Sequence, residues 1–175
     1  MKSRRNIAAI LIALIATAVP VAVQAQDSSA VRYQTISDRC QSLHLLLDEL
    51  QRRDLVSRTN LGREYESMAR LFNAFNQRVK NNNLNVQPFE QLTQDFNNAT
   101  SQFRSAYVEY DDGLIALQQI DCKEKPADFD AQLARTRELR DVTEGAATYA
   151  NALSGQYRTQ MVQLQSELPA ARSNN

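Results

Sequence analysis

The chain has 175 residues, 43% of them apolar, and it carries 20 Lys and Arg against 20 Asp and Glu. This length allows one domain of ordinary size. The zero net charge, without any block of basic residues, argues against nucleic acid as the main partner, because phosphate neutralisation needs clustered Lys and Arg. Only four glycines are present, which excludes a Gly-rich phosphate loop, and the single histidine, His44, excludes sites that need two imidazoles. We therefore expect no catalytic residues, no metal and no cofactor.

The first 25 residues have the composition of a secretory signal peptide. Lys2, Arg4 and Arg5 precede an apolar run over residues 7–19, and small residues form a cleavage site that ends at Ala25. The alternative is an uncleaved segment that tethers the protein to the membrane. A proline interrupts this apolar stretch, which is also shorter than the about 20 residues of a spanning helix. We expect cleavage, an extracytoplasmic protein (periplasmic, at the cell surface or secreted), and no membrane span in the mature chain.

Apolar residues spaced by three and four positions predict a first helix from about residue 30 to about residue 80. The stripe starts at Tyr33 and reaches Val79 in one phase. Gly62 falls inside it, and glycine weakens a helix by about 1 kcal/mol relative to alanine. The pattern leaves open whether this helix is continuous or bent across residues 54–62.

Two further helices are predicted at about 88–120 and 126–166, each opening with a proline in its first turn. The stripe of the second helix runs from Phe89 to Ile120 and is the cleanest in the chain. The sequence thus predicts an all-α fold, an elongated antiparallel three-helix bundle over residues 26–168, because short connections make consecutive helices antiparallel neighbours. We expect a disordered tail at 169–175.

The two cysteines provide an independent check on this topology. Cys40 lies near the start of the first helix and Cys122 just past the end of the second, so an up-and-down hairpin brings them to the same end. An exported chain meets an oxidising compartment, and we therefore predict a Cys40–Cys122 disulfide. The competing interpretations are weaker, because a reactive pair lacks the Cys-X-X-Cys spacing and a zinc site lacks ligands.

Residues at equal distances from the disulfide end suggest a polar layer across the bundle. Asp54 lies 14 residues beyond Cys40, and Arg140 lies 14 residues beyond Pro126. Counting back from Cys122 reaches Tyr107 and Tyr110 at the same height. An arginine at a core position needs a partner, because an unpaired buried charge is costly. The layer that we predict pairs Asp54, with Arg58, to Arg140 beside Tyr107 or Tyr110, and places Thr143 and Glu144 nearby.

Three interpretations of this layer remain open. In the first, the helix breaks before Gly62, its phase shifts, and these side chains are simply solvated. In the second, the layer is buried and sets the register of the helices. The third interpretation is a site for a small ligand. Sequence alone does not choose among them.

A candidate partner surface lies on the first helix. Leu45 and Leu46 fall outside the main stripe and form a second apolar edge, which either meets another protein or packs under the connection between the other helices. Arg52 and Arg53 form a basic patch that would suit an anionic polymer of the cell envelope, although charges at this density usually mark a solvated face. The partner is thus an unidentified protein or envelope polymer, and no pattern specifies an oligomeric state.

The absence of catalytic groups favours an exported binding or structural module. An alternative is a holdase-type chaperone of the extracytoplasmic space. Leu92-Thr93-Gln94 is similar to the Leu-Thr pairs of the Spy and CpxP stress-protein group, but the Gln does not follow that group's spacing and the element is not repeated. A second alternative is a sensor domain that binds a small ligand in the polar layer.

Overall fold

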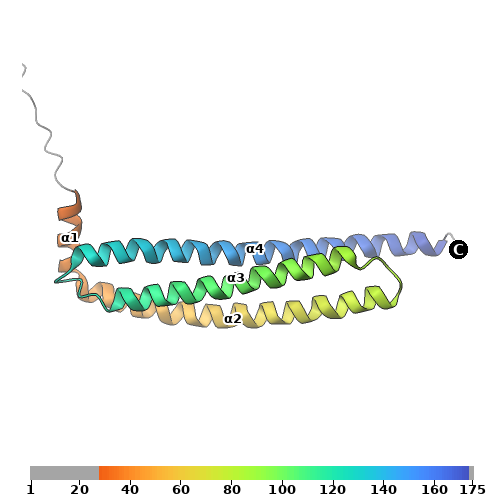
Figure 1. Ribbon diagram of the computed structural model, residues 1–175, viewed down its shortest axis with the longest axis horizontal. Coiled ribbons are helices and arrows are strands. Elements are labelled where there is room, and N and C mark those ends of the chain that lie inside the picture. The colour runs from red at the N-terminus through yellow and green to blue at the C-terminus, as the bar shows by residue number, and fades with distance from the viewer. Residues whose placement is uncertain (1–27, 174–175) are drawn as a thin grey trace, which may run out of the picture.

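The computed structural model describes residues 28–173, with side-chain environments described for 28–167; the predicted signal peptide lies outside this range. The described chain forms helices and no β-strand, so the predicted all-α class is confirmed. Three long helices lie side by side and a short one stands at one end (Figure 1). The helices are α1 (Ser28–Asp38), α2 (Cys40–Asn81), α3 (Gln87–Gln118) and α4 (Pro126–Ser173).

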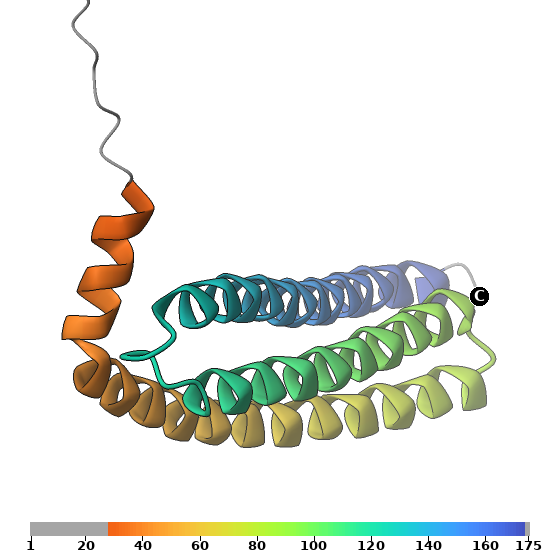
Figure 2. The same cartoon turned by 60° about the vertical axis from the view of Figure 1, so that its left-hand side comes forward.

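The predicted single helix over residues 30–80 is wrong, because the chain turns at Arg39. This residue has φ −104° and ψ 11°, between α1 and α2, and α1 leaves the end of α2 at a steep angle (Figure 2). An ion pair holds α1 against the start of α4, with Arg32 Nη1 3.0 Å from Asp130 Oδ2. The apolar stripe continues in phase through the turn, so periodicity could not reveal it.

The question left open by the sequence is answered for continuity: α2 is one unbroken helix through residues 54–62. A Cβ atom at Gly62 would meet nothing within 4 Å, so no close packing requires the glycine. The cost of one helical glycine, about 1 kcal/mol, is small beside the apolar contacts that α2 makes on both sides of it.

Asparagines form the turn between α2 and α3. Asn83 has φ 58°, a left-handed conformation that asparagine adopts more readily than most residues. Between α3 and α4, the side chain of Asp121 accepts hydrogen bonds from the backbone N–H groups of Lys123 (2.9 Å) and Glu124 (3.2 Å). This local turn satisfies backbone donors ahead of α4.

The predicted tail at 169–175 is wrong for residues 169–173, which continue α4 as a helix to Ser173. The helix continues through Pro169, which lacks a backbone N–H and disfavours a helix interior, and no contact described in the structure explains this.

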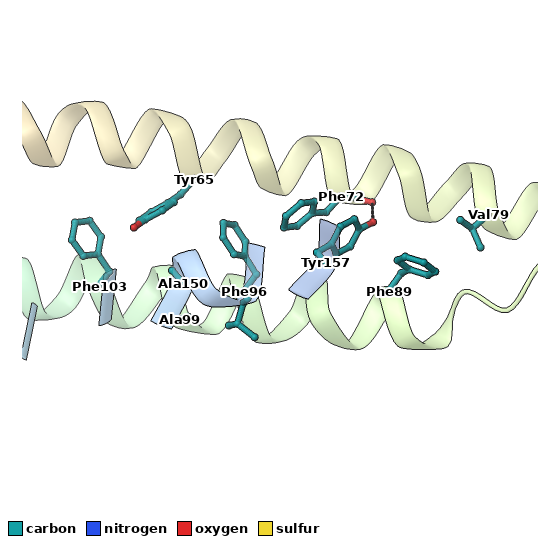
Figure 3. Packing of buried hydrophobic residues seen from close by; sticks show 10 residues of the cluster. Tyr65, Phe72, Val79, Phe89, Phe96, Ala99, Phe103, Ala150 and Tyr157 are labelled. Carbon is teal, nitrogen blue, oxygen red and sulfur yellow. Dashed lines mark hydrogen bonds between the residues drawn. The ribbon is translucent and has the colours of Figure 1, made fainter. Parts of the chain in front are cut away.

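Two clusters of buried side chains hold the long helices together. The aromatic cluster lies toward the α2–α3 turn (Figure 3) and contains Tyr65, Phe72, Val79, Phe89, Phe96, Ala99, Phe103, Ala150, Leu153 and Tyr157. The disulfide cluster lies toward α1 and contains Ile36, Leu47, Tyr107, Tyr110, Leu114, Leu117, Cys122 and Phe129.

A glycine lets α3 and α4 approach closely beside the disulfide cluster. A Cβ atom on Gly113 would lie 3.1 Å from Leu139 Cδ1 and 3.2 Å from Thr136 Oγ1. Thr136 Oγ1 also lies 3.1 Å from the Gly113 carbonyl oxygen and 2.8 Å from that of Gln132, so its hydroxyl has a carbonyl acceptor on either helix. The absent side chain allows this close approach, and the Thr136 hydroxyl bridges the two helices there.

The predicted pairing of Cys40 with Cys122 is confirmed, because the two residues lie at disulfide distance with 5.4 Å between their Cα atoms. The pair joins the first turn of α2 to the connection between α3 and α4. No described helix has an apolar stretch long enough to cross a membrane.

Candidate functional site

One pocket, which we call the polar pocket, brings together the five side chains of the predicted polar layer: Asp54, Arg58, Tyr107, Tyr110 and Arg140. Its volume is about 130 Å³. It is open to one side and lies between α2, α3 and α4, where the two buried clusters meet. The rest of its wall is formed by Ser57, Leu61, Phe103, Thr143, Glu144 and Ala147.

Tyr110 and Asp54 form the inner hydrogen bond of the pocket. The Tyr110 hydroxyl donates to Asp54 Oδ2 at 2.7 Å, and Tyr110 is almost completely buried. Burial, and then the hydrogen bond to the Asp54 carboxylate, raise the pKa of Tyr110 far above its usual value. The phenol therefore stays protonated and keeps the Asp54 carboxylate turned toward α3, with its second oxygen left for another donor.

Arg58 and Tyr107 form the second pair. The Arg58 guanidinium carbon lies 4.7 Å from the centre of the Tyr107 ring, a distance typical of a cation–π contact. Tyr107 is only 4% exposed, and its hydroxyl is the one buried side-chain polar atom in the described structure without a hydrogen-bond partner. Burial raises the pKa of Tyr107, so this hydroxyl is a proton donor at neutral pH.

The predicted pairing of Arg140 with Asp54 is wrong. Arg140 Nε donates to Glu144 Oε1 at 2.8 Å, one turn further along α4, and the Arg140 side chain is 48% exposed. The hydrogen bond to Glu144 is the largest cause that raises the pKa of Arg140. A partner four residues away on the same helix needs no exact fit between helices, which explains why it is preferred to the carboxylate on α2. Arg140 is therefore at the rim of the pocket and not in the core.

A buried polar network inside the aromatic cluster was not predicted from the sequence. The Tyr157 hydroxyl lies 2.6 Å from Asn76 Oδ1 and 3.0 Å from the Phe72 carbonyl oxygen, the contact drawn as a dashed line in Figure 3. Asn76 Nδ2 in turn donates to Thr93 Oγ1 at 2.9 Å. The network joins α4, α2 and α3. Its signal was present in the sequence, since Asn76 lies four residues after Phe72 on the buried face of α2.

The predicted partner surface lies on the side of α2 that faces away from the core. Leu45 is 64% and Leu46 66% exposed, so neither packs under a connection between helices. Arg52 and Arg53 are also exposed, and both lie within salt-bridge distance of the same carboxylate, that of Glu49. We call this surface the outer edge of α2; it contains Leu45, Leu46, Glu49, Arg52, Arg53 and Val56.

The disulfide end brings the single histidine near the two sulfur atoms. One nitrogen of His44 and the sulfurs of Cys40 and Cys122 all lie within 4.8 Å of one another. The sulfur atoms are bonded to each other, so in the oxidised protein they are not available as thiolate ligands. The His44 ring packs instead against Phe129, with 6.1 Å between ring centroids.

Comparison with protein-family models finds no match for this chain, and comparisons with curated proteins and with solved structures likewise find none. The function is therefore inferred from the residues of the chain itself.

Proposed function

We propose that this protein is an exported three-helix bundle without catalytic activity, which binds a partner protein through the outer edge of α2. Residues 1–25 support export, because a charged start, an apolar run and a small-residue end are typical of a secretory signal peptide. The disulfide supports the same location, since such bonds persist in oxidising compartments.

The observation that carries the proposal is the pair of exposed leucines at the start of α2. A single exposed leucine is ordinary on a protein surface. Here two are adjacent, and Val56, which is also exposed, follows Leu45 by three helical turns on the same side of the helix. Grouped aliphatic side chains that remain in water are typical of a surface that a partner covers.

The charges on this edge favour a protein over an anionic polymer. Arg52 and Arg53 both approach Glu49, so part of their positive charge is compensated within α2. An anionic polymer would need uncompensated cations, whereas a protein interface combines apolar anchors with a polar rim. The outer edge, with Leu45 and Leu46 beside charged residues, has the composition of a protein interface.

Affinity capture with the purified, oxidised protein as bait tests the proposal. Native envelope extract is passed over the wild type and over the double variant Leu45→Asp plus Leu46→Asp. Leu71→Asp is the matched control, because Leu71 is 67% exposed on the same helix but lies outside the outer edge. We expect one saturable partner that the double variant loses and the control keeps.

Two results would contradict the proposal. A partner that binds the wild type and the double variant equally would show that another surface is used. Capture of a broad mixture of unfolded proteins, with suppression of their aggregation, would instead support the holdase-type chaperone.

A further inference from the structure

Two opposite charges in the polar pocket have no ion-pair partner within the described structure. Asp54 and Arg58 are four residues apart on α2, a spacing at which acidic and basic side chains commonly pair. They do not form a salt bridge here, because Asp54 turns to the Tyr110 hydroxyl and Arg58 turns to the Tyr107 ring. The same wall of the pocket thus presents one carboxylate and one guanidinium that form no salt bridge in the described structure.

The hydroxyl of Tyr107, whose ring Arg58 contacts, is a hydrogen-bond donor without an acceptor in the described structure. It is buried, it has no hydrogen-bond partner in the described residues, and it belongs to a ring that lines the pocket. A buried hydroxyl without a partner loses the hydrogen bonds that water would supply, and a ligand acceptor would restore one. A carboxylate accepts from a guanidinium and a phenol together, so it suits Arg58 and Tyr107.

The remaining wall limits the size and the polarity of what can bind. Leu61, Phe103 and Ala147 give the pocket an apolar part, and its volume of about 130 Å³ is well below the roughly 300 Å³ at which pockets for drug-sized ligands begin. The other two charged residues of the lining, Arg140 and Glu144, form an ion pair whose charges cancel. The pocket as a whole therefore carries no net charge but separates its positive and negative groups.

We propose that the polar pocket binds the zwitterion of a small aliphatic amino acid. The α-carboxylate accepts hydrogen bonds from the Arg58 guanidinium and the Tyr107 hydroxyl. The ammonium group donates to the second carboxylate oxygen of Asp54, and the aliphatic side chain packs against Leu61 and Phe103. This inference is independent of the proposed protein partner, because the outer edge of α2 lies on the opposite side of that helix.

Calorimetric titration of the full oxidised protein with L-valine tests the proposal. The comparison ligands are 3-methylbutanoate, which lacks the ammonium group, and 2-methylpropylamine, which lacks the carboxylate. We expect L-valine to bind at least about tenfold more tightly than either, because each removes one charge-assisted contact. Bound L-valine should also raise the unfolding temperature, since it binds the folded chain.

Two variants assign the binding to named groups. Tyr107→Phe keeps the packed ring and removes only the unpartnered hydroxyl, so we expect it to fold and to weaken L-valine binding roughly tenfold. Arg58→Gln should weaken it further. The matched controls are Tyr149→Phe and Arg63→Gln, two exposed positions outside the pocket, and neither should change the affinity.

The proposal is overturned if L-valine gives no saturable heat, or if either comparison ligand binds as tightly as L-valine. It is also overturned if Tyr107→Phe, folded by circular dichroism, binds L-valine with the affinity of the wild type.

Discussion

The two halves of the molecule are held together by different means. In the half near the α2–α3 turn, large rings separate the helices: Phe72 and Tyr157 stack with 3.8 Å between centroids, and Tyr65 meets Phe96 edge to face at 5.8 Å. In the half near α1, a disulfide joins α2 to the α3–α4 connection, and Gly113 lets α3 and α4 approach closely. One half relies on aromatic packing with a buried polar network, and the other on a covalent bond.

The polar pocket lies where these two halves meet, and the difference between them explains why charges are tolerated there. Phe103 on its wall belongs to the aromatic cluster, while Tyr107 and Tyr110 belong to the disulfide cluster. At the boundary the rings of Phe103 and Tyr107 still meet, with 6.4 Å between centroids, but Asp54 and Arg58 are only partly buried there.

The largest effect should come from removing the covalent link. Replacing Cys40 and Cys122 together by serine should lower the free energy of unfolding by about 4 kcal/mol, because the bond restricts the unfolded chain between residues 82 positions apart. Urea unfolding of the oxidised wild type and the double variant measures the change. Hydrogen exchange should accelerate more near α1 than in the aromatic cluster. Equal acceleration in both halves would show that the disulfide does not stabilise the α1 half selectively.

Filling the close contact between α3 and α4 should have the next largest effect. Gly113→Val places methyl groups against Leu139 and Thr136 and should destabilise the protein by about 2 kcal/mol. Gly145→Val is the matched control, because a Cβ atom there meets nothing within 4 Å, and its effect should stay below about 0.5 kcal/mol. Equal effects of the two substitutions in thermal unfolding would contradict the assigned role of Gly113.

The polar network of the aromatic half should cost less to break. Tyr157→Phe leaves Asn76 and the Phe72 carbonyl without the hydroxyl donor, and we expect a loss of about 1.5 kcal/mol at neutral pH. Chemical denaturation measures this loss, with Tyr149→Phe as the exposed control that should leave stability unchanged.

The network also predicts a pH dependence. Burial raises the pKa of Tyr157 to about 12, against 10.0 for an ordinary tyrosine. The unfolded chain therefore gives up this proton first, and stability that is present below pH 10 should fall as the pH rises toward 12. Stability curves over this range should fall less steeply in Tyr157→Phe than in the wild type; identical slopes would contradict the burial of this hydroxyl.

The smallest effect is expected at Gly62 on α2, where no neighbour restricts a side chain. Gly62→Ala should stabilise the protein by about 0.5–1 kcal/mol, since alanine favours the helix and nothing lies within 4 Å of the new Cβ atom. Thermal unfolding measures the gain. A loss instead would show that α2 needs a flexible point between the two halves.

The helical stripe and the positions of the cysteines sufficed to predict α3, the course of α2 beyond the turn at Arg39, and the covalent link, because these depend on residue type and distance along the chain. Phe89, Phe96 and Leu117 are buried on α3 as their spacing requires. The same reasoning collected the residues of the polar pocket, since equal distances from the disulfide give equal heights along parallel axes.

Other features depend on choices that spacing does not encode. Arg140 had an acceptor on its own helix in Glu144 as well as one across the pocket, and only three-dimensional geometry decides between them. The turn at Arg39 places α1 beside a segment about 100 residues away, where Arg32 pairs with Asp130, and such distant contacts are not encoded in the spacing of apolar residues. Asn76 was overlooked because a polar residue on a buried face is recognised only when its partners are known.

The position of the disulfide also determines how the protein would respond to a pulling force. A load applied between Ser28 and Ser173 passes along α1, crosses from Cys40 to Cys122 through the covalent bond, and continues along α4. The hairpin of α2 and α3 lies outside this path and carries no tension while the bond is intact. Reduction of the bond would place residues 41–121 in the load path, so the oxidised protein would extend far less under force than the reduced one.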